Sequence, residues 1–293
     1  MEPGFVKLKD IKPVLSGYLR EAQYILSPSK SPDDKVIHDV RVLMKKSRAT
    51  LKLVITQVDQ EIFAREYNAL REVGRVMRTW RETSVYRKTL KDLKKNNPDV
   101  FSMLAENEQL GALMNKAEPS PELTENQQND LVKIRGLLHR SESRIRFFKM
   151  DGLEPRILLQ ELEKTYDIVV NDYLNCRNNP KTVNLHEFRK KAKDFLYQLY
   201  FFRPFNPPVV KSLEKKLDTL TQNLGKYNDL AQIIRTIGYK YGNSGNPVAL
   251  DELIVIIRNI QDRYLLKVWP QAYKTFCPGQ KLENILRIRQ PLT

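Results

Sequence analysis

Two short strings of histidine and basic residues are the part of this sequence best suited to chemistry. They read His38-x-x-Arg41-x-x-x-Lys45 and, 148 residues later, His186-x-x-Arg189-x-x-x-Lys193. Arginine offers a planar fork of donors and lysine a point charge, and both form charge-assisted hydrogen bonds with phosphate oxygens. Histidine adds a donor whose charge changes near pH 6.5. These residue types predict a site for a phosphate-rich anion.

Helical spacing arranges each string as a ridge. At about 100° per residue, a basic ridge contains His38, Arg41, Lys45, Arg48 and Lys52. The residues opposite it are apolar: Val40, Leu43, Leu51 and Val54. The second ridge carries His186, Arg189 and Lys193, with Phe188, Phe195, Leu199 and Phe202 behind it. Like charges at this spacing repel by some tenths of a kcal/mol per pair, and an anion would relieve the repulsion. A single ridge would favour a solvated face; two matching ridges favour a ligand site.

The two strings also indicate an internal duplication. Val73-Gly74 follows the first string and Leu224-Gly225 the second, 36 and 39 residues after the respective histidines. We interpret each dipeptide as a turn and divide the chain into repeats near residues 1–151 and 152–293, within one domain that spans residues 1–293. Duplicated helical units commonly pack about a pseudo-two-fold axis. Such an axis would bring the two histidine helices to one shared surface.

The elements that must position these residues are helices. Segments with a period near 3.6 cover residues 33–59, 61–95, 121–150, 154–177, 183–203, 207–224 and 248–275. Six Ser-Pro or Asn-Pro dipeptides, of which Asn97-Pro98 and Asn206-Pro207 are two, mark helix starts. Alternating strand-like runs are absent. We predict an all-α fold of about ten helices in antiparallel bundles.

Composition limits the function classes. The formal net charge is +15, and residues 65–95 and 181–216 each carry +6 while residues 96–130 carry −6. A localised excess of positive charge suits a polyanion. Two cysteines, no apolar run long enough to span a membrane and no signal-like N-terminus predict a soluble, cytoplasmic protein without a membrane partner. We expect no cofactor, no metal site and no catalytic residue, because no phosphate loop or nucleophile motif occurs.

The paired strings resemble the CHAD family, the conserved histidine α-helical domain, over nearly the whole chain. The segment Leu224-Gly225-Lys226-Tyr227-Asn228-Asp229 is close to the family's L-G-x-x-N-D, whereas the first half has Met77 and Arg78 where the family shows Arg-Asp. The resemblance implies two four-helix bundles related by pseudo-two-fold symmetry, a central basic cavity, binding of inorganic polyphosphate and association with polyphosphate granules. By motif position, the implied phosphate ligands are His38, Arg41, Lys45, Arg48, His186, Arg189 and Lys193. Positions on the basic helix faces add Lys46, Lys52, Arg75, Arg78 and Lys190 as further candidates. Other polyanions are further candidate ligands.

Two alternatives compete with polyphosphate binding. A nucleic-acid-binding helical protein would explain the charge, but the nearest aromatic cluster, Tyr197 to Phe202, has the spacing of core residues. A metal-dependent phosphohydrolase would need more ligands than the His38-Asp39 dipeptide supplies. Two assays separate these alternatives. One measures whether single-stranded RNA competes with polyphosphate, and the other measures metal-dependent release of phosphate.

Overall fold

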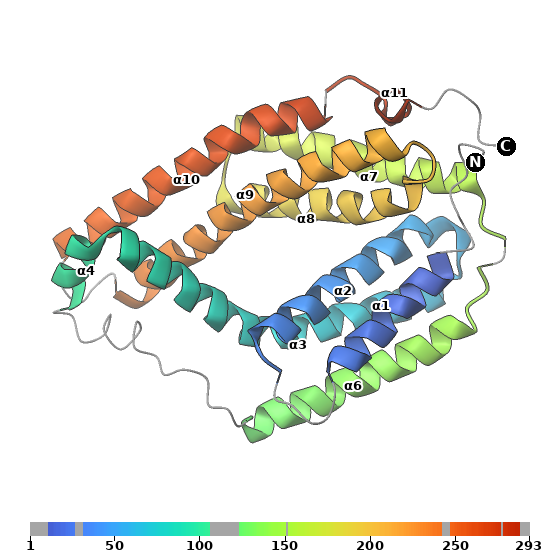
Figure 1. Cartoon of the computed structure of the whole chain (residues 1–293), viewed down its shortest axis with the longest axis horizontal. Coiled ribbons are helices and arrows are strands. Elements are labelled where there is room, and N and C mark those ends of the chain that lie inside the picture. The colour runs from blue at the N-terminus through green and yellow to red at the C-terminus, as the bar shows by residue number, and fades with distance from the viewer. Residues whose placement is uncertain are drawn as a thin grey trace.

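The structure is all-α. The computed structural model describes residues 11–26, 32–105, 123–150, 152–241, 247–276 and 278–287, which contain helices and no strands (Figure 1). The predicted fold class is therefore confirmed. Within those ranges, no helix combines the length and the apolar character needed to cross a bilayer.

The helices divide between the two predicted halves. The first half contains α1 (Ile11–Ile25), α2 (Asp34–Leu53), the 3₁₀ helix η2 (Ile55–Gln57), α3 (Gln60–Asn96), α4 (Pro98–Ala105) and α6 (Glu125–Arg146). The second contains α7 (Pro155–Asn178), α8 (Thr182–Leu199), the 3₁₀ helix η3 (Tyr200–Phe202), α9 (Pro207–Tyr241), α10 (Pro247–Phe276) and α11 (Leu282–Leu286). In the first half α1 contacts α2, α2 contacts α3, and α6 contacts both α3 and α1. In the second half α7, α8, α9 and α10 repeat this order of contacts. The shared order fits a duplication, and the symmetry axis itself stays a prediction.

Several helix starts follow from local chemistry. Pro98, Pro207 and Pro247 are the first residues of α4, α9 and α10, where a proline loses no helical hydrogen bond. The α2 helix begins two residues after Pro32, and the Asp33 carboxylate accepts a hydrogen bond from the Val36 N–H at 2.7 Å. This cap fixes where the first ridge starts.

Two separate groups of apolar side chains hold the helices together. The main core buries the apolar faces predicted behind both ridges: Val40, Leu43, Leu51, Val54, Phe188, Phe195, Leu199 and Phe202. A second group, which we call the distal cluster, lies where α3, α4, α9 and α10 meet beyond the main core; its members include Leu93, Phe101, Ile233 and Ile257. The α3 and α9 helices are long enough to belong to both groups, and they also contact each other.

The predicted turns at the two glycines are wrong. Gly74 lies inside α3, and α9 continues through Gly225 to Tyr241 rather than ending at residue 224. The predicted helices 33–59 and 183–203 are also too long, because α2 ends at Leu53 and α8 at Leu199, each followed by a short 3₁₀ helix. A glycine inside a helix lowers stability relative to alanine, so these positions call for a reason that lies outside local propensity.

Candidate functional site

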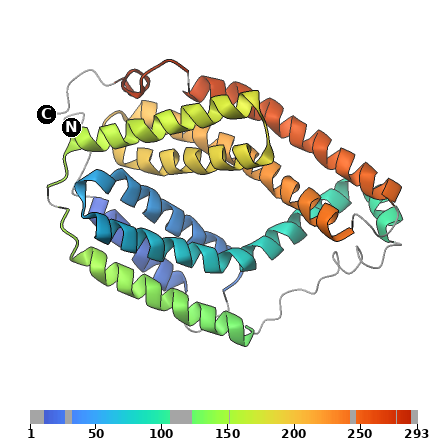
Figure 2. The ribbon, with the colours of Figure 1, turned by 180° about the vertical axis from the view of Figure 1, so that it is seen from behind.

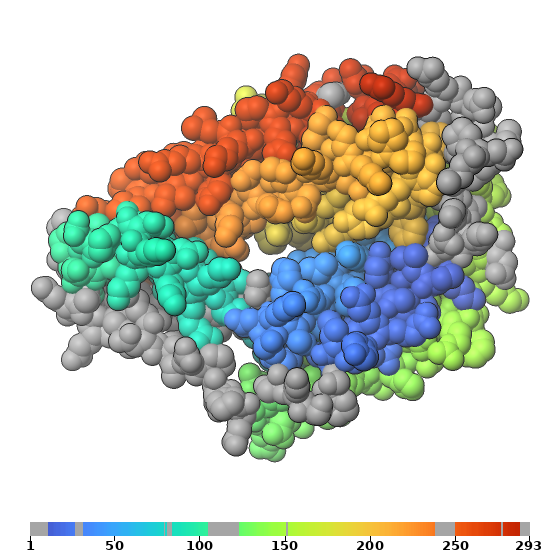
Figure 3. All heavy atoms as spheres, viewed as in Figure 1, coloured from blue at the N-terminus to red at the C-terminus, as the bar shows by residue number. Residues whose placement is uncertain are grey.

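The two histidine helices, α2 and α8, contact each other and form a V. Near the point of the V, the Gln198 side chain donates to the Ala49 carbonyl at 3.1 Å, and Lys52 Nζ pairs with Asp194 Oδ2 at 2.6 Å. Toward their N-termini the two helices diverge, as both ribbon views show (Figures 1 and 2). The surface is hollowed between α2, α3 and α9 on this side (Figure 3). We call this space the central hollow.

Five cations from the two helices gather at the inner part of the V. This cation cluster consists of Arg41, Lys45, Arg48, Arg189 and Lys193. Burial is the largest cause lowering the pKa of Lys45 from 10.5 to about 7, followed by the positive charges of the other four. These five residues, three from the first motif helix and two from the second, are the members of the two motifs that lie together. A buried group of like charges without enough carboxylates favours either loss of a proton or binding of an anion.

Only part of the cluster is neutralised by the protein. Lys193 Nζ pairs with Asp218 Oδ1 of α9 at 2.9 Å. Lys45 makes no hydrogen bond or ion pair within the described part of the chain. The Nε of Arg48 is buried without a hydrogen-bond partner, and its guanidinium lies 5.9 Å from the Tyr67 ring centre. The cluster therefore retains an excess of positive charge.

The two glycines sit where the motif arginines meet the long helices. Arg41 Nη1 donates to the Gly74 carbonyl of α3 at 2.5 Å, and Arg189 Nε donates to the Thr221 carbonyl of α9 at 3.1 Å. A Cβ placed on Gly225 would lie 3.3 Å from Arg189 Nε and Nη2, whereas one on Gly74 would meet nothing within 4 Å. Gly225 thus leaves room for a guanidinium, which explains a glycine in mid-helix. Gly74 contributes only a carbonyl.

The histidines lie one turn before the arginines, nearer the opening of the V. Partial burial and then the charges of Lys190, Arg189 and Arg78 lower the pKa of His186, although Glu187 acts in the opposite direction. Arg78 belongs to α3, so its charge acts on His186 from a helix of the other half of the chain. His38 lies at the matching position on α2, and its side chain is exposed.

Four other predicted basic residues have partners within the described structure. Lys46 lies over the rings of Tyr18 and Tyr200, at 5.5 and 5.9 Å from their centres, and Lys52 is paired with Asp194, so both brace the V. Lys190 pairs with Glu187 at 2.9 Å on the same helix. Arg75 does not join the cation cluster. It pairs with Glu72, which also accepts from Lys133 of α6.

Sequence reasoning missed three polar residues on α9 beside the second ridge. Asp218 neutralises Lys193, and Asp229 opposes the lowering of the pKa of Arg189 that burial causes. Asn228 has both side-chain amide atoms buried without a hydrogen-bond partner. The family-like string around Gly225 contains the last two, and it was interpreted as a turn. If the helix is continued through Gly225 instead, Asn228 and Asp229 lie within about one turn of that glycine.

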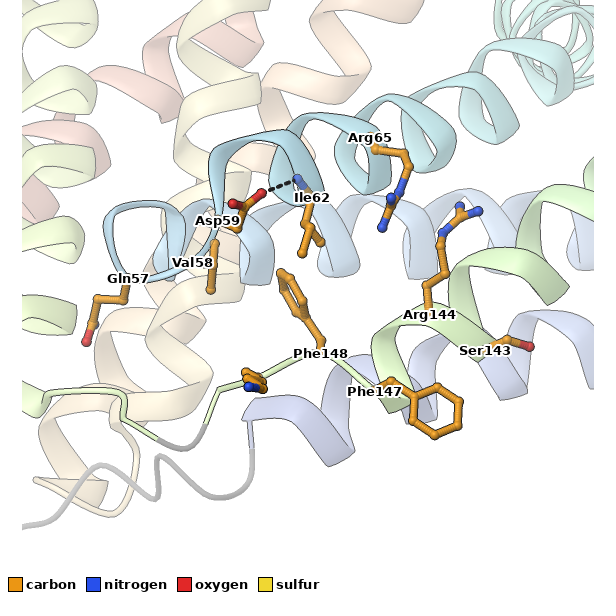
Figure 4. Close-up of a pocket in the computed structure, with 10 residues that line it drawn as sticks. Gln57, Val58, Asp59, Ile62, Arg65, Ser143, Arg144, Phe147 and Phe148 are labelled. Atoms are coloured by element: carbon orange, nitrogen blue, oxygen red, sulfur yellow. Dashed lines mark hydrogen bonds between the residues drawn. The ribbon is translucent and has the colours of Figure 1, made fainter.

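A separate pocket lies away from the central hollow. It has a volume of about 630 Å³ between the start of α3 and the end of α6 and is lined in part by Ile62, Arg65, Arg144 and Phe148 (Figure 4). Both arginines pair with the fully buried Glu66, at 2.9 and 2.5 Å. None of the predicted site residues lines this pocket. Across the described ranges, no three His, Cys, Asp or Glu side chains are grouped so that they could hold a metal ion.

Comparisons with known proteins point to one family. A family model described as the CHAD domain matches residues 14–237. The structure is similar to the crystal structure of the CHAD domain from the plant Ricinus communis, with a TM-score of 0.59 and 13% sequence identity over 96% of this chain and 94% of that one. No curated protein matches the sequence. The structural likeness at this identity concerns the fold.

Proposed function

Because the chain belongs to the CHAD family, a family associated with polyphosphate binding, we propose that it binds inorganic polyphosphate in the central hollow. The proposed ligands are His38, Arg41, Lys45, Arg48, His186, Arg189 and Lys193, with Arg78 as an additional contact from α3. In this proposal residues 1–293 act as one binding domain, and association with polyphosphate granules follows from the same chemistry.

The excess positive charge of the cation cluster is the observation that supports this proposal most strongly. Two helices from different halves of the chain bring five cations together, and Lys45 among them has no anionic partner in the described residues. Polyphosphate carries about one negative charge per phosphate, so a chain of phosphates can contact arginines and lysines one helical turn apart. Such a ligand needs no base recognition, which fits a site in which cations outnumber carboxylates.

Aromatic residues distinguish polyphosphate from single-stranded nucleic acid. Tyr197, Phe201 and Phe202 are buried, and Tyr200 is covered by the Arg203 guanidinium at 4.3 Å. Stacking of bases needs exposed ring faces beside the charges. We therefore expect single-stranded RNA, at equal phosphate concentration, to displace labelled long-chain polyphosphate poorly. Equal displacement would favour the nucleic-acid alternative.

The direct experiment measures binding of polyphosphates of graded length to the wild type and to Arg41→Glu/Arg189→Glu. Hydrogen bonds to charged groups contribute about 1.5–3 kcal/mol each, so we expect the double variant to lose at least tenfold in affinity. The matched control is Lys149→Glu/Arg156→Glu, which changes the net charge equally at exposed positions outside the cluster. Equal loss in both variants would mean general charge attraction and would overturn the proposed site.

Arg41 and Arg189 also anchor α3 and α9, so circular dichroism must show that the double variant is folded. Lys45→Met provides a second test, because the Lys45 amine supports no other side chain or carbonyl in the described structure. We expect this variant to fold and to bind polyphosphate more weakly than the wild type. Unchanged affinity of Lys45→Met at pH 6.5 would contradict a role for this residue in binding.

We propose that the binding is not accompanied by catalysis. The pure protein, mixed with polyphosphate and Mg²⁺ or Mn²⁺, is expected to release no phosphate. Metal-dependent release that His38→Ala abolishes would favour the phosphohydrolase alternative instead.

A further inference from the structure

The amine of Lys45 differs from those of the neighbouring lysines. Lys46 lies over two tyrosine rings, Lys52 pairs with Asp194, and Lys193 pairs with Asp218. Lys45, by contrast, has no hydrogen bond or ion pair within the described residues. Lys45 is half-buried, so part of its surface remains exposed to solvent. Lys45 is thus an unpartnered amine in a site suited to phosphate.

The surroundings of Lys45 favour its neutral form. On α2 it is preceded by Arg41 and followed by Arg48, and Arg189 and Lys193 act on it from α8. Arginine stays protonated at all physiological pH values, so these charges oppose protonation of the lysine. Burial first, and then these charges, lower the pKa of Lys45 to about 7. A neutral amine held beside cationic groups is an activated nucleophile.

We propose that Lys45 is a modification site that small acyl phosphates acylate at Nζ. The amine attacks the carbonyl carbon and forms a C–N bond, and the bond between that carbon and the bridging oxygen breaks. Phosphate leaves with the electron pair of the broken bond, and the proton lost from the nitrogen ends on that phosphate. The products are a neutral amide and hydrogen phosphate, so the step needs no oxidant, reductant or metal.

The neighbouring arginines provide the selectivity for a phosphate leaving group. Arg41, Arg48 and Arg189 can bind the phosphoryl oxygens of the acyl phosphate, which brings its carbonyl group close to Lys45. The same charges stabilise the phosphate as it leaves. This recruitment rests on the proposed function, because it uses the proposed polyphosphate ligands.

Three effects set the expected rate. At pH 7.5 an amine with a pKa near 7 is mostly neutral, whereas an ordinary lysine is neutral in only about one molecule in a thousand. Nucleophilicity falls as basicity falls, which removes a large part of this advantage. Recruitment of the phosphoryl group acts in favour of Lys45. We expect Lys45 to react at least tenfold faster than Lys46.

The product would regulate the site. An acylated Lys45 cannot gain a proton, so the modified cluster offers one cation fewer to a phosphate chain. Bound polyphosphate should in turn shield Lys45 from the acyl phosphate. Polyphosphate binding and acylation would therefore exclude each other.

The experiment treats the full chain with acetyl phosphate at pH 7.5 and follows acetylation by peptide mapping with Asp-N, which releases residues 39–58 as one peptide. Lys46 is the matched control on that peptide. A parallel reaction uses p-nitrophenyl acetate, an acyl donor without a phosphate group. We expect a rate ratio of Lys45 to Lys46 of at least ten with acetyl phosphate, a smaller ratio with the neutral ester, and protection of Lys45 by long-chain polyphosphate.

Equal rates at Lys45 and Lys46 would overturn the inference, and so would the same ratio with both acyl donors. Polyphosphate binding is measured separately, so the two proposals can fail independently. Tight polyphosphate binding with equal acylation rates leaves the proposed function standing without the modification site. Preferential acylation of Lys45 in a protein that binds no polyphosphate would contradict the proposed function alone. If bound polyphosphate does not slow the preferential acylation of Lys45, the regulatory part of the inference is wrong.

Discussion

Lys45 and His186 make the charge of the proposed site depend on pH. Both have a lowered pKa, because burial and neighbouring cations disfavour their protonated forms. A bound phosphate chain reverses the sign of the local field and raises both pKa values. A group whose pKa rises on binding takes up a proton, so binding must tighten as pH falls.

We predict that affinity for long-chain polyphosphate increases about fivefold from pH 8 to pH 7, with a smaller further increase to pH 6. Calorimetry at pH 8 in buffers of different ionisation enthalpy should show uptake approaching one proton, since Lys45 with a pKa of about 7 is then mostly neutral in the empty site. In Lys45→Arg the added group stays charged, so the uptake at pH 8 should disappear. Flat affinity across this range at fixed salt would exclude proton-linked binding by both residues.

Residue type and spacing predicted which basic residues share a helix face, because a helical period fixes which side chains lie together. Arg41, Lys45 and Arg48 could be placed on one ridge in this way. The spacing could not show that Arg75 pairs with Glu72 and Lys133, because that depends on how α6 packs against α3. Nor could it show the lowered pKa of Lys45, which is caused first by burial and then by neighbouring cations, of which Arg189 and Lys193 approach from another helix.

At the scale of the elements, both motif arginines join a short helix to a long one. Arg41 links α2 to α3 and Arg189 links α8 to α9, in each case through a backbone carbonyl. The helical period predicts helices, one of which covers Gly74, yet the two glycine dipeptides suggest turns because glycine usually interrupts a helical pattern. The reason for Gly225 is the guanidinium packed against it, and no local rule detects a tertiary contact of that kind.

The two glycines provide a matched pair of substitutions. Alanine inside a helix is favoured over glycine by about 1 kcal/mol, and Gly74→Ala meets no atom within 4 Å, so this variant should be more stable by about that amount with unchanged polyphosphate affinity. Gly225→Ala brings a methyl group to 3.3 Å from Arg189, whose Nε is held by the Thr221 carbonyl. It should gain less stability and lose affinity severalfold. Chemical denaturation and binding assays on both variants test this, and equal affinities would contradict a role for Gly225 in positioning Arg189.

At the scale of the whole molecule, the central hollow lies between the two apolar groups. The main core holds the V of α2 and α8, and the distal cluster holds the far parts of α3 and α9. Because α3 and α9 pass from one group to the other, the distal cluster fixes where these two helices border the hollow. The hydrophobic periodicity of each helix predicted buried faces but could not predict two clusters, since their separation depends on the lengths and crossing of α3 and α9.

Phe101→Ala tests the distal cluster. Phe101 is almost fully buried there, and removing such a ring typically destabilises a protein by about 3–5 kcal/mol. We predict that hydrogen exchange increases mainly in α4 and in the far parts of α3, α9 and α10, while α2 and α8 keep their protection. Uniform loss of protection across all helices would show instead that the two clusters unfold as one cooperative unit.

The salt dependence of polyphosphate binding distinguishes association driven by the net charge of +15 from association driven by the five-residue cation cluster. Distributed surface charge and a localised site respond differently to substitution. By analogy with single-stranded nucleic acids, a cluster that neutralises five phosphates gives a slope of about −3.5 in a plot of log affinity against log salt concentration. At pH 6.5, Lys45→Met should reduce the magnitude of the slope by about 0.7, one contact's worth. Lys149→Glu, at an exposed position outside the cluster, should leave the slope close to that of the wild type. If both substitutions change the slope equally, the overall charge of the protein drives association and the cation cluster contributes no more than other surface charges. Titrations at four salt concentrations are sufficient to separate these outcomes.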